Sequence, residues 1–148
     1  MTQERTGEPW MTSGEYGRSL PNFTVNLVVR NLVRSLDFYR EVLGAEVVYS
    51  DVDFAALRVA GLEFMLHADH TYDAHPWWGA LQGGTLRGLG AELRLFRVSP
   101  DEIESRARKH GSRVLQPAKD KPHGWRDVIV CDPDGYTWAV GVPVPASK

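Results

Sequence analysis

Residues 31–44, NLVRSLDFYREVLG, show the strongest local pattern in the chain. Between Leu32 and Leu43, apolar residues recur every three or four positions, which places them on one face of an α-helix. Asn31 is a suitable N-cap residue, and Gly44 is a suitable terminator. We therefore predict an amphipathic helix here, with its apolar face packed against a sheet.

Strand-like segments flank this helix on both sides. They are short runs rich in β-branched and aromatic residues, which is typical of strands. One lies before the helix, at residues 23–29, and three follow it, at 45–50, 53–59 and 62–68. The order predicts a βαβββ unit.

The second half of the chain repeats this pattern. Ser99 and Pro100 begin a second helix that ends at Gly111. The strand-like segments of this half are residues 91–98, 112–118, 125–132 and 136–142. The N-caps Asn31 and Ser99 lie 68 positions apart, and the terminators Gly44 and Gly111 lie 67 apart. This near-constant offset predicts an α+β fold made of two βαβββ modules.

These boundaries predict a single domain over residues 22–147. Its first module spans 22–70 and its second spans 90–143, and residues 71–89 link them. The linker is long and rich in glycine and aromatic residues, so we expect it to serve as a lid, a wall of a ligand site or a dimer contact. Residues 1–21 are rich in Gly, Ser, Thr and Glu and are expected to form a flexible leader.

Composition excludes several classes of function. The 148-residue chain has a net charge of −2 and no basic run, so neither nucleic acid nor a membrane surface is an expected partner. A single cysteine, Cys131, excludes an internal disulfide and fits a reducing compartment. No apolar run has the length of a membrane span or a signal peptide, which favours the cytoplasm.

Three segments resemble the glyoxalase/bleomycin-resistance/dioxygenase superfamily, also called vicinal oxygen chelate proteins. They are NLVRSLDFYREVLGAEV at 31–47, KPHGWRD at 121–127 and DVIVCDPDGYTWAVG at 127–141. The resemblance extends over about residues 22–143. It implies mixed sheets curved around a central ligand cavity. In the metal-dependent members, four side chains hold a divalent ion there, one from the first and one from the last strand of each module.

Counting along the chain from the motifs shared with the family places those four positions at Thr24, Met65, Glu92 and Ala139. Only Glu92 is a good ligand for a hard divalent ion. The resemblance therefore implies that the usual metal site has been lost, and no cofactor is expected. A divalent metal bound in a non-standard site by Glu92, His67 and His123 is the alternative.

Glu92 has three interpretations at this point. It could be a catalytic base with its pKa raised by an apolar cavity, a ligand-binding group, or a structural partner of Arg94 or Arg126. Other candidates for ligand binding combine aromatic surface with polar groups near the implied cavity. They are Thr24, Met65, His67, Trp77, Trp78, His123, Trp125, Arg126 and Trp138.

We therefore predict that the protein binds or sequesters a small aromatic or cationic molecule in the cavity between the modules, without a metal. The alternative is an enzyme, either a glyoxalase-like lyase or isomerase or a dioxygenase, which uses a non-standard metal site or Glu92 as a base. A homodimer is expected in both cases. The residues do not identify the ligand.

Overall fold

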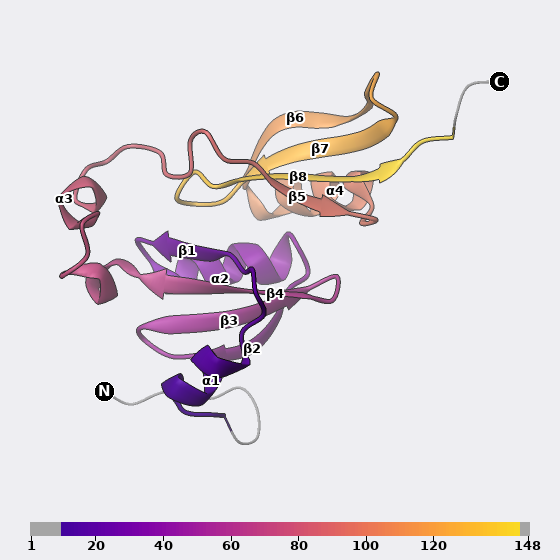
Figure 1. Ribbon diagram of the computed structural model, residues 1–148. Helices are drawn as coiled ribbons and strands as arrows, with labels where there is room; N and C mark the ends of the chain where they lie inside the picture. Colours follow the sequence, from indigo (N-terminus) through magenta and orange to yellow (C-terminus); the bar gives the residue numbers. More distant parts are fainter. Residues whose placement is uncertain (1–9, 146–148) are drawn as a thin grey trace. The chain divides into compact units, whose positions relative to one another are not determined.

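The computed structural model describes residues 10–145, which contain two four-stranded mixed sheets (Figure 1). In the first sheet the strand order is β1-β4-β3-β2, with β1 and β4 parallel and the other pairs antiparallel. Its strands are β1 (Asn26–Val29), β2 (Glu46–Ser50), β3 (Phe54–Val59) and β4 (Leu62–Ala68).

The second sheet repeats this topology. Its order is β5-β8-β7-β6, with β5 and β8 parallel and the other pairs antiparallel. Its strands are β5 (Leu93–Phe96), β6 (Arg113–Asp120), β7 (Trp125–Cys131) and β8 (Thr137–Pro143). The α+β class and the duplicated βαβββ pattern are confirmed.

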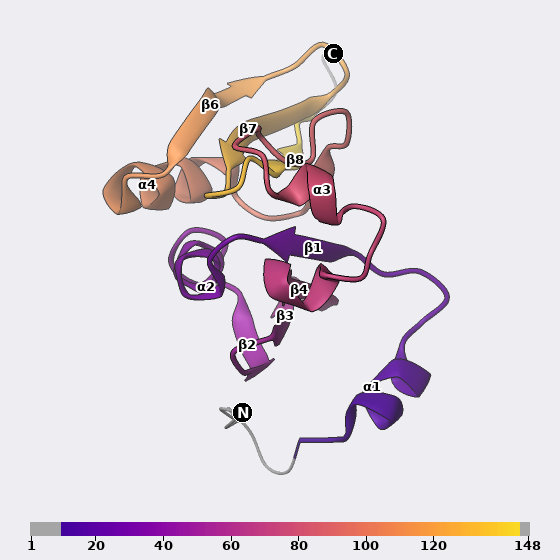
Figure 2. The same cartoon turned by 90° about the vertical axis from the view of Figure 1, so that its left-hand side faces the viewer.

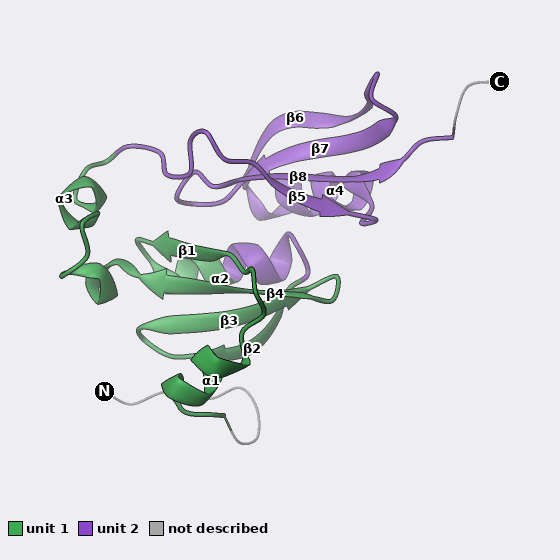
Figure 3. Cartoon of the chain, viewed as in Figure 1, with its two compact units in different colours: residues 1–36, 45–84 green, residues 37–44, 85–148 purple. Residues whose placement is uncertain are grey.

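The chain forms two compact units, shown in different colours in Figure 3. Unit 1 comprises residues 1–36 and 45–84, and unit 2 comprises 37–44 and 85–148. This division differs from the predicted modules, because the second part of the helix α2 (Leu32–Glu41) belongs to unit 2. Tyr39 gives the physical reason, since its hydroxyl donates a 2.7 Å hydrogen bond to Asp132 in that unit.

The predicted N-caps of both helices and the predicted terminator of the second are present, while α2 ends at Glu41, before the predicted terminator Gly44. The side chain of Asn31 accepts a hydrogen bond from the backbone N–H of Arg34 at 3.0 Å, where α2 begins. The second module's helix, α4 (Pro100–His110), has Ser99 as its N-cap and ends at Gly111, whose φ of 80° suits glycine.

Unit 1 contains a helix in the segment that the sequence analysis expected to be a flexible leader. Helix α1 (Ser13–Ser19) begins with a capping box, in which the side chains of Thr12 and Glu15 each accept a backbone N–H. Tyr16 on this helix packs with Ala56 and Met65 of the first sheet. Figure 2 shows α1 beside this sheet. Residues 1–9 of the predicted leader lie outside the described residues.

The two faces of the first sheet are covered differently. Successive side chains of a strand point to opposite faces. Leu57 and Leu66 are fully buried on one face. Ala56 and Met65, which are also paired in register, belong to the other face, which α1 covers. The face beneath α1 contains the pocket described below.

The linker has regular structure at two points. The 3₁₀ helix η1 (Asp69–Tyr72) directly follows β4, and α3 (Trp78–Leu81) lies further along the chain. Among the described residues, no helix is both long and apolar enough to cross a membrane.

Candidate ligand-binding site

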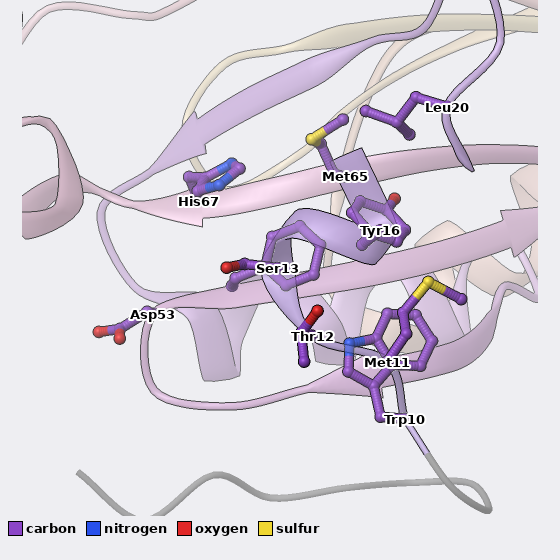
Figure 4. Close-up of a pocket in the computed structure, with 10 residues that line it drawn as sticks. Trp10, Met11, Thr12, Ser13, Tyr16, Leu20, Asp53, Met65 and His67 are labelled. Carbon is purple, nitrogen blue, oxygen red and sulfur yellow. The ribbon is translucent and has the colours of Figure 1, made fainter. Parts of the chain in front are cut away.

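A pocket of about 450 Å³ lies in unit 1, between the α1 segment and the first sheet (Figure 4). Its aromatic lining residues are Trp10, Tyr16 and Phe54, and Met65 adds a thioether. This volume is within the range of small-molecule sites, which span about 300–1,000 Å³. The pocket is therefore large enough for a ligand of one or two rings.

The aromatic side chains hold one another in position. The ring of Trp10 stacks on Tyr49 of β2, with centroids 4.5 Å apart and planes 6° from parallel. Tyr16 meets the ring of Phe54 edge-on, at a centroid distance of 5.3 Å. Such pairs contribute about 0.5–1.5 kcal/mol beyond their buried area. The pocket walls are thus packed before any ligand binds.

Tyr16 is a neutral hydroxyl at physiological pH. Burial, with a smaller contribution from the Glu63 carboxylate, raises the pKa of Tyr16 to about 12. The phenol group can therefore donate a hydrogen bond but does not ionise.

His67 on β4 supplies the imidazole of the pocket lining. Its Nδ1 lies 2.6 Å from Oδ1 of Asn26, and the amide nitrogen of Asn26 donates to the hydroxyl of Tyr72. Burial lowers the pKa of His67, although Asp51 and Asp53 act in the opposite direction. The ring is thus neutral at pH 7 and is oriented by Asn26.

Asp53 supplies the carboxylate of the pocket lining. The preceding turn is fixed by Asp51, whose Oδ1 accepts the backbone N–H groups of Asp53 and Phe54 at 2.8 and 2.9 Å. Oδ1 of Asp53 lies 2.6 Å from Nε2 of His70. Among the described lining residues, none is Lys or Arg. The pocket therefore offers hydrogen-bond acceptors and negative charge rather than positive charge.

The candidates from the first module and the linker divide into two groups. Met65 and His67 line the pocket together. Thr24 lies just before β1 and directs its hydroxyl to the carbonyl oxygen of Glu63, 3.4 Å away. Trp77 is 55% exposed and stacks on Tyr72, while Trp78 begins α3, and neither lines this pocket.

Glu92 lies one residue before β5, in unit 2. Its carboxylate is 41% exposed and accepts a 2.8 Å hydrogen bond from Nε of Arg94. Of the three interpretations, the ion pair with Arg94 is the arrangement present in the structure. Glu92 also lines a second cavity of about 340 Å³, together with Arg113 and Cys131.

Arg126 and Trp138 have structural partners in unit 2. Arg126 makes two hydrogen bonds to Asp101 and a third to Asp120, and these bonds raise the pKa of its guanidinium. The indole N–H of Trp138, which is buried, donates to the hydroxyl of Tyr39 at 3.2 Å. Both side chains are thus engaged within the unit.

His123 lies near the buried carboxylate of Asp127, and Trp125 packs on β5. Nε2 of His123 is 3.9 Å from Asp127, and the ammonium of Lys121 is 2.7 Å from it. The ring of Trp125 packs on Phe96 at 4.7 Å.

The residues at the family's metal positions do not fit a divalent ion. Met65 and Ala139 lie on β4 and β8 as the family frame implied, and neither is a ligand for a hard cation. Within residues 10–145, no group of three or more His, Cys, Asp or Glu side chains is arranged to hold a metal.

Comparison with known proteins identifies the family. A model of the glyoxalase/bleomycin resistance protein/dioxygenase superfamily matches residues 22–140. The chain belongs to this superfamily. Among curated proteins, no sequence matches this superfamily member significantly.

Solved structures of the superfamily share the fold. One from Nocardioides, a glyoxalase/bleomycin resistance protein/dioxygenase, has a TM-score of 0.67 and 23% identity, and the match covers 91% of this chain and 95% of that one. A family enzyme from Burkholderia phytofirmans PsJN has a TM-score of 0.68, 16% identity and coverage of 82% and 97%. The fosfomycin resistance protein FosX from Listeria monocytogenes has a TM-score of 0.62, 18% identity and coverage of 84% and 94%.

Several residues of the pocket were not among the sequence candidates. Trp10 and Tyr16 lie in the segment predicted to be flexible, although the Thr12-x-x-Glu15 spacing is a recognisable helix start. Asn26 does not line the pocket but contacts His67, which does, and it lies in register with Met65 on the neighbouring strand. Residues two apart in a strand point to the same face, so the prediction for Thr24 could have indicated that Asn26 points to the same face as Thr24.

Proposed function

We propose that this protein binds a small planar molecule, aromatic and either cationic or rich in hydrogen-bond donors, in the unit 1 pocket and without a metal. The observation that supports this most directly is the composition of the pocket. Aromatic rings from Trp10, Tyr16 and Phe54 line the same volume as the carboxylate of Asp53 and the imidazole of His67. Rings that stack on the ligand and a carboxylate that accepts from its amino group can together bind an aromatic amine.

Two further observations support binding without a metal. The family's metal positions in this chain are Thr24, Met65, Glu92 and Ala139, and of these only Glu92 is a good ligand. That carboxylate is already paired with Arg94.

We also propose that the protein acts in the cytoplasm. Its single cysteine, Cys131, is free and buried, which suits a reducing compartment.

The test is a thermal-shift screen of aromatic amines, with elemental analysis of protein purified without a chelator. We expect stabilising hits and less than stoichiometric transition metal. Ser13→Trp should lower the affinity of a hit at least about tenfold, because Ser13 is exposed and lines the pocket, so that a larger side chain fills it.

Arg18→Trp is the matched control for this variant. Arg18 is exposed on the same helix but does not line the pocket, so its replacement should leave affinity unchanged. Equal affinities of the two variants would place the ligand elsewhere, and a stoichiometric bound metal would exclude metal-free binding.

The enzymatic alternative depends on Glu92, which lines the second cavity. If Glu92 is a structural partner of Arg94, Glu92→Gln should leave ligand affinity within about twofold and change the unfolding free energy by less than about 1 kcal/mol. Titration calorimetry and urea unfolding measure these quantities. Turnover of any screened compound that disappears in Glu92→Gln would instead establish the glyoxalase-type lyase, isomerase or dioxygenase.

We also propose that the protein forms a homodimer. The linker, residues 71–89, carries exposed large apolar side chains: Trp77, Leu86 and Leu89 are 55%, 58% and 93% exposed. Large apolar side chains exposed along a short segment favour association. Sedimentation at micromolar concentration should show a dimer, and Leu89→Glu should shift the protein toward the monomer. A monomer across this concentration range would refute the proposal.

A further inference from the structure

The two ring nitrogens of His67 have different surroundings. Nδ1 lies 2.6 Å from Oδ1 of Asn26. An amide oxygen only accepts hydrogen bonds, so Nδ1 bears the proton and donates it. The amide nitrogen of Asn26 donates to the hydroxyl of Tyr72, which holds the amide in this orientation. Asn26 thereby selects one tautomer of the neutral imidazole.

Nε2 of this tautomer is an acceptor with a lone pair. Among the described residues, no hydrogen bond to Nε2 is present, and the His67 side chain lines the pocket. The ring lies between Phe54 and Tyr72, at centroid distances of 5.0 and 5.9 Å. These contacts limit how far the imidazole can turn away from the pocket.

The carboxylate of Asp53, which also lines the pocket, is already engaged through one of its oxygens. Oδ1 of Asp53 is already 2.6 Å from Nε2 of His70. Burial lowers the pKa of His67, so its ring stays uncharged at neutral pH and keeps its lone pair. Nε2 of His67 is therefore an oriented, half-buried acceptor that a ligand in the pocket can satisfy.

We propose that His67 is the specificity-determining residue of this pocket: its Nε2, oriented by Asn26, selects aromatic ligands with a ring N–H or O–H over ligands of the same shape without that donor. This inference rests on the proposed function, since it assigns a ligand class to the same pocket. An occupant without a donor leaves the imidazole nitrogen desolvated and unpaired, which costs about 1–3 kcal/mol.

Indole and benzofuran form a matched pair of probes, because they have nearly the same shape and only indole has an N–H. We expect the full-length protein at pH 7.5 to bind indole about 10- to 100-fold more tightly than benzofuran, the ratio that corresponds to such an unpaired group. His67→Phe, which keeps a ring but has no acceptor, should bring this ratio close to one. His67→Gln, which retains an acceptor oxygen, should restore part of it.

Asn26 provides a second, ligand-independent readout. In the wild type, nitrogen-15 NMR of the histidine side chains should show His67 protonated at Nδ1 and not at Nε2. Asn26→Leu should lose this preference, whereas Asn26→Asp should keep it because both carboxylate oxygens accept. These spectra also establish that each variant is folded.

The outcomes separate the inference from the proposed function. If both probes bind with equal affinity and His67→Phe changes neither affinity, the inference is overturned, while the proposed binding of aromatic molecules in this pocket is retained. A His67 ring protonated at Nε2 in the wild type overturns the inference as well. If neither probe shifts the resonances of Phe54 or Met65, the proposed function fails, and the inference fails with it.

Discussion

Replacement of Asp132 by alanine is expected to lower the unfolding free energy by at least about 3 kcal/mol. One oxygen of Asp132 accepts the backbone N–H groups of Asp134, Gly135 and Tyr136, each at 2.9 Å. The other oxygen accepts the hydroxyl of Tyr39 at 2.7 Å. Asp132 is only 3% exposed, so alanine would leave these donors buried without a partner.

Urea unfolding at pH 7, followed by tryptophan fluorescence, measures this loss. Tyr39→Phe removes a single hydroxyl and should cost about 1–2 kcal/mol. Asp73→Ala is the control, because Asp73 is exposed and its replacement should change stability by less than about 0.5 kcal/mol. A loss below about 1 kcal/mol for Asp132→Ala would show that water replaces the carboxylate in this turn.

The same carboxyl group should make stability depend on pH. Burial raises the pKa of Asp132 to about 6, from the ordinary value of 3.8 that the unfolded chain retains. Between these two values the folded protein binds more protons than the unfolded chain, so the contribution of Asp132 to stability falls as pH rises from about 4 to 6. The decline is at most about 3 kcal/mol. It should be absent in Asp132→Asn, and the difference between the two pH profiles measures it.

Local signals in the sequence were sufficient for the fold. The N-caps Asn31 and Ser99 and the terminator Gly111 act through hydrogen bonds within one helical turn, so short-range spacing predicted them correctly. Strand ends were less accurate: β1 begins at Asn26 and β5 at Leu93, later than the apolar pattern indicated. The residue at which a strand begins depends on its pairing with a strand distant in the sequence, and a local pattern carries no information about that pairing.

The candidate site was only partly predictable, because its contacts are long-range. The family frame gave Met65, and period-two alternation gave His67, and both line the pocket. The partner of Glu92 remained open until the structure placed Arg94 against it. Tyr16 was missed because its packing on Ala56 joins segments about forty residues apart, and the apolar pattern of so short a helix is weak.

Trp10, just before α1, lines the pocket from the α1 side. Trp10→Ala is expected to weaken binding of an aromatic amine at least about tenfold and to lower the unfolding free energy by about 2 kcal/mol. The indole stacks on Tyr49 at 4.5 Å and packs on Tyr16 at 5.5 Å, so alanine removes one aromatic wall together with its buried area. Replacement of a fully buried tryptophan costs about 3–5 kcal/mol, and Trp10 is only half-buried.

Two further variants test whether Trp10 acts through the pocket. Trp10→Phe keeps a stacking ring and should recover most of the affinity and stability. Trp77→Ala removes an exposed indole that stacks on Tyr72 and does not line the pocket, so affinity should not change. Calorimetric titration with the best amine from the screen compares the three proteins. If Trp10→Ala bound this amine as tightly as the wild type, Trp10 would contribute only to stability. The ligand would then contact the sheet but not Trp10.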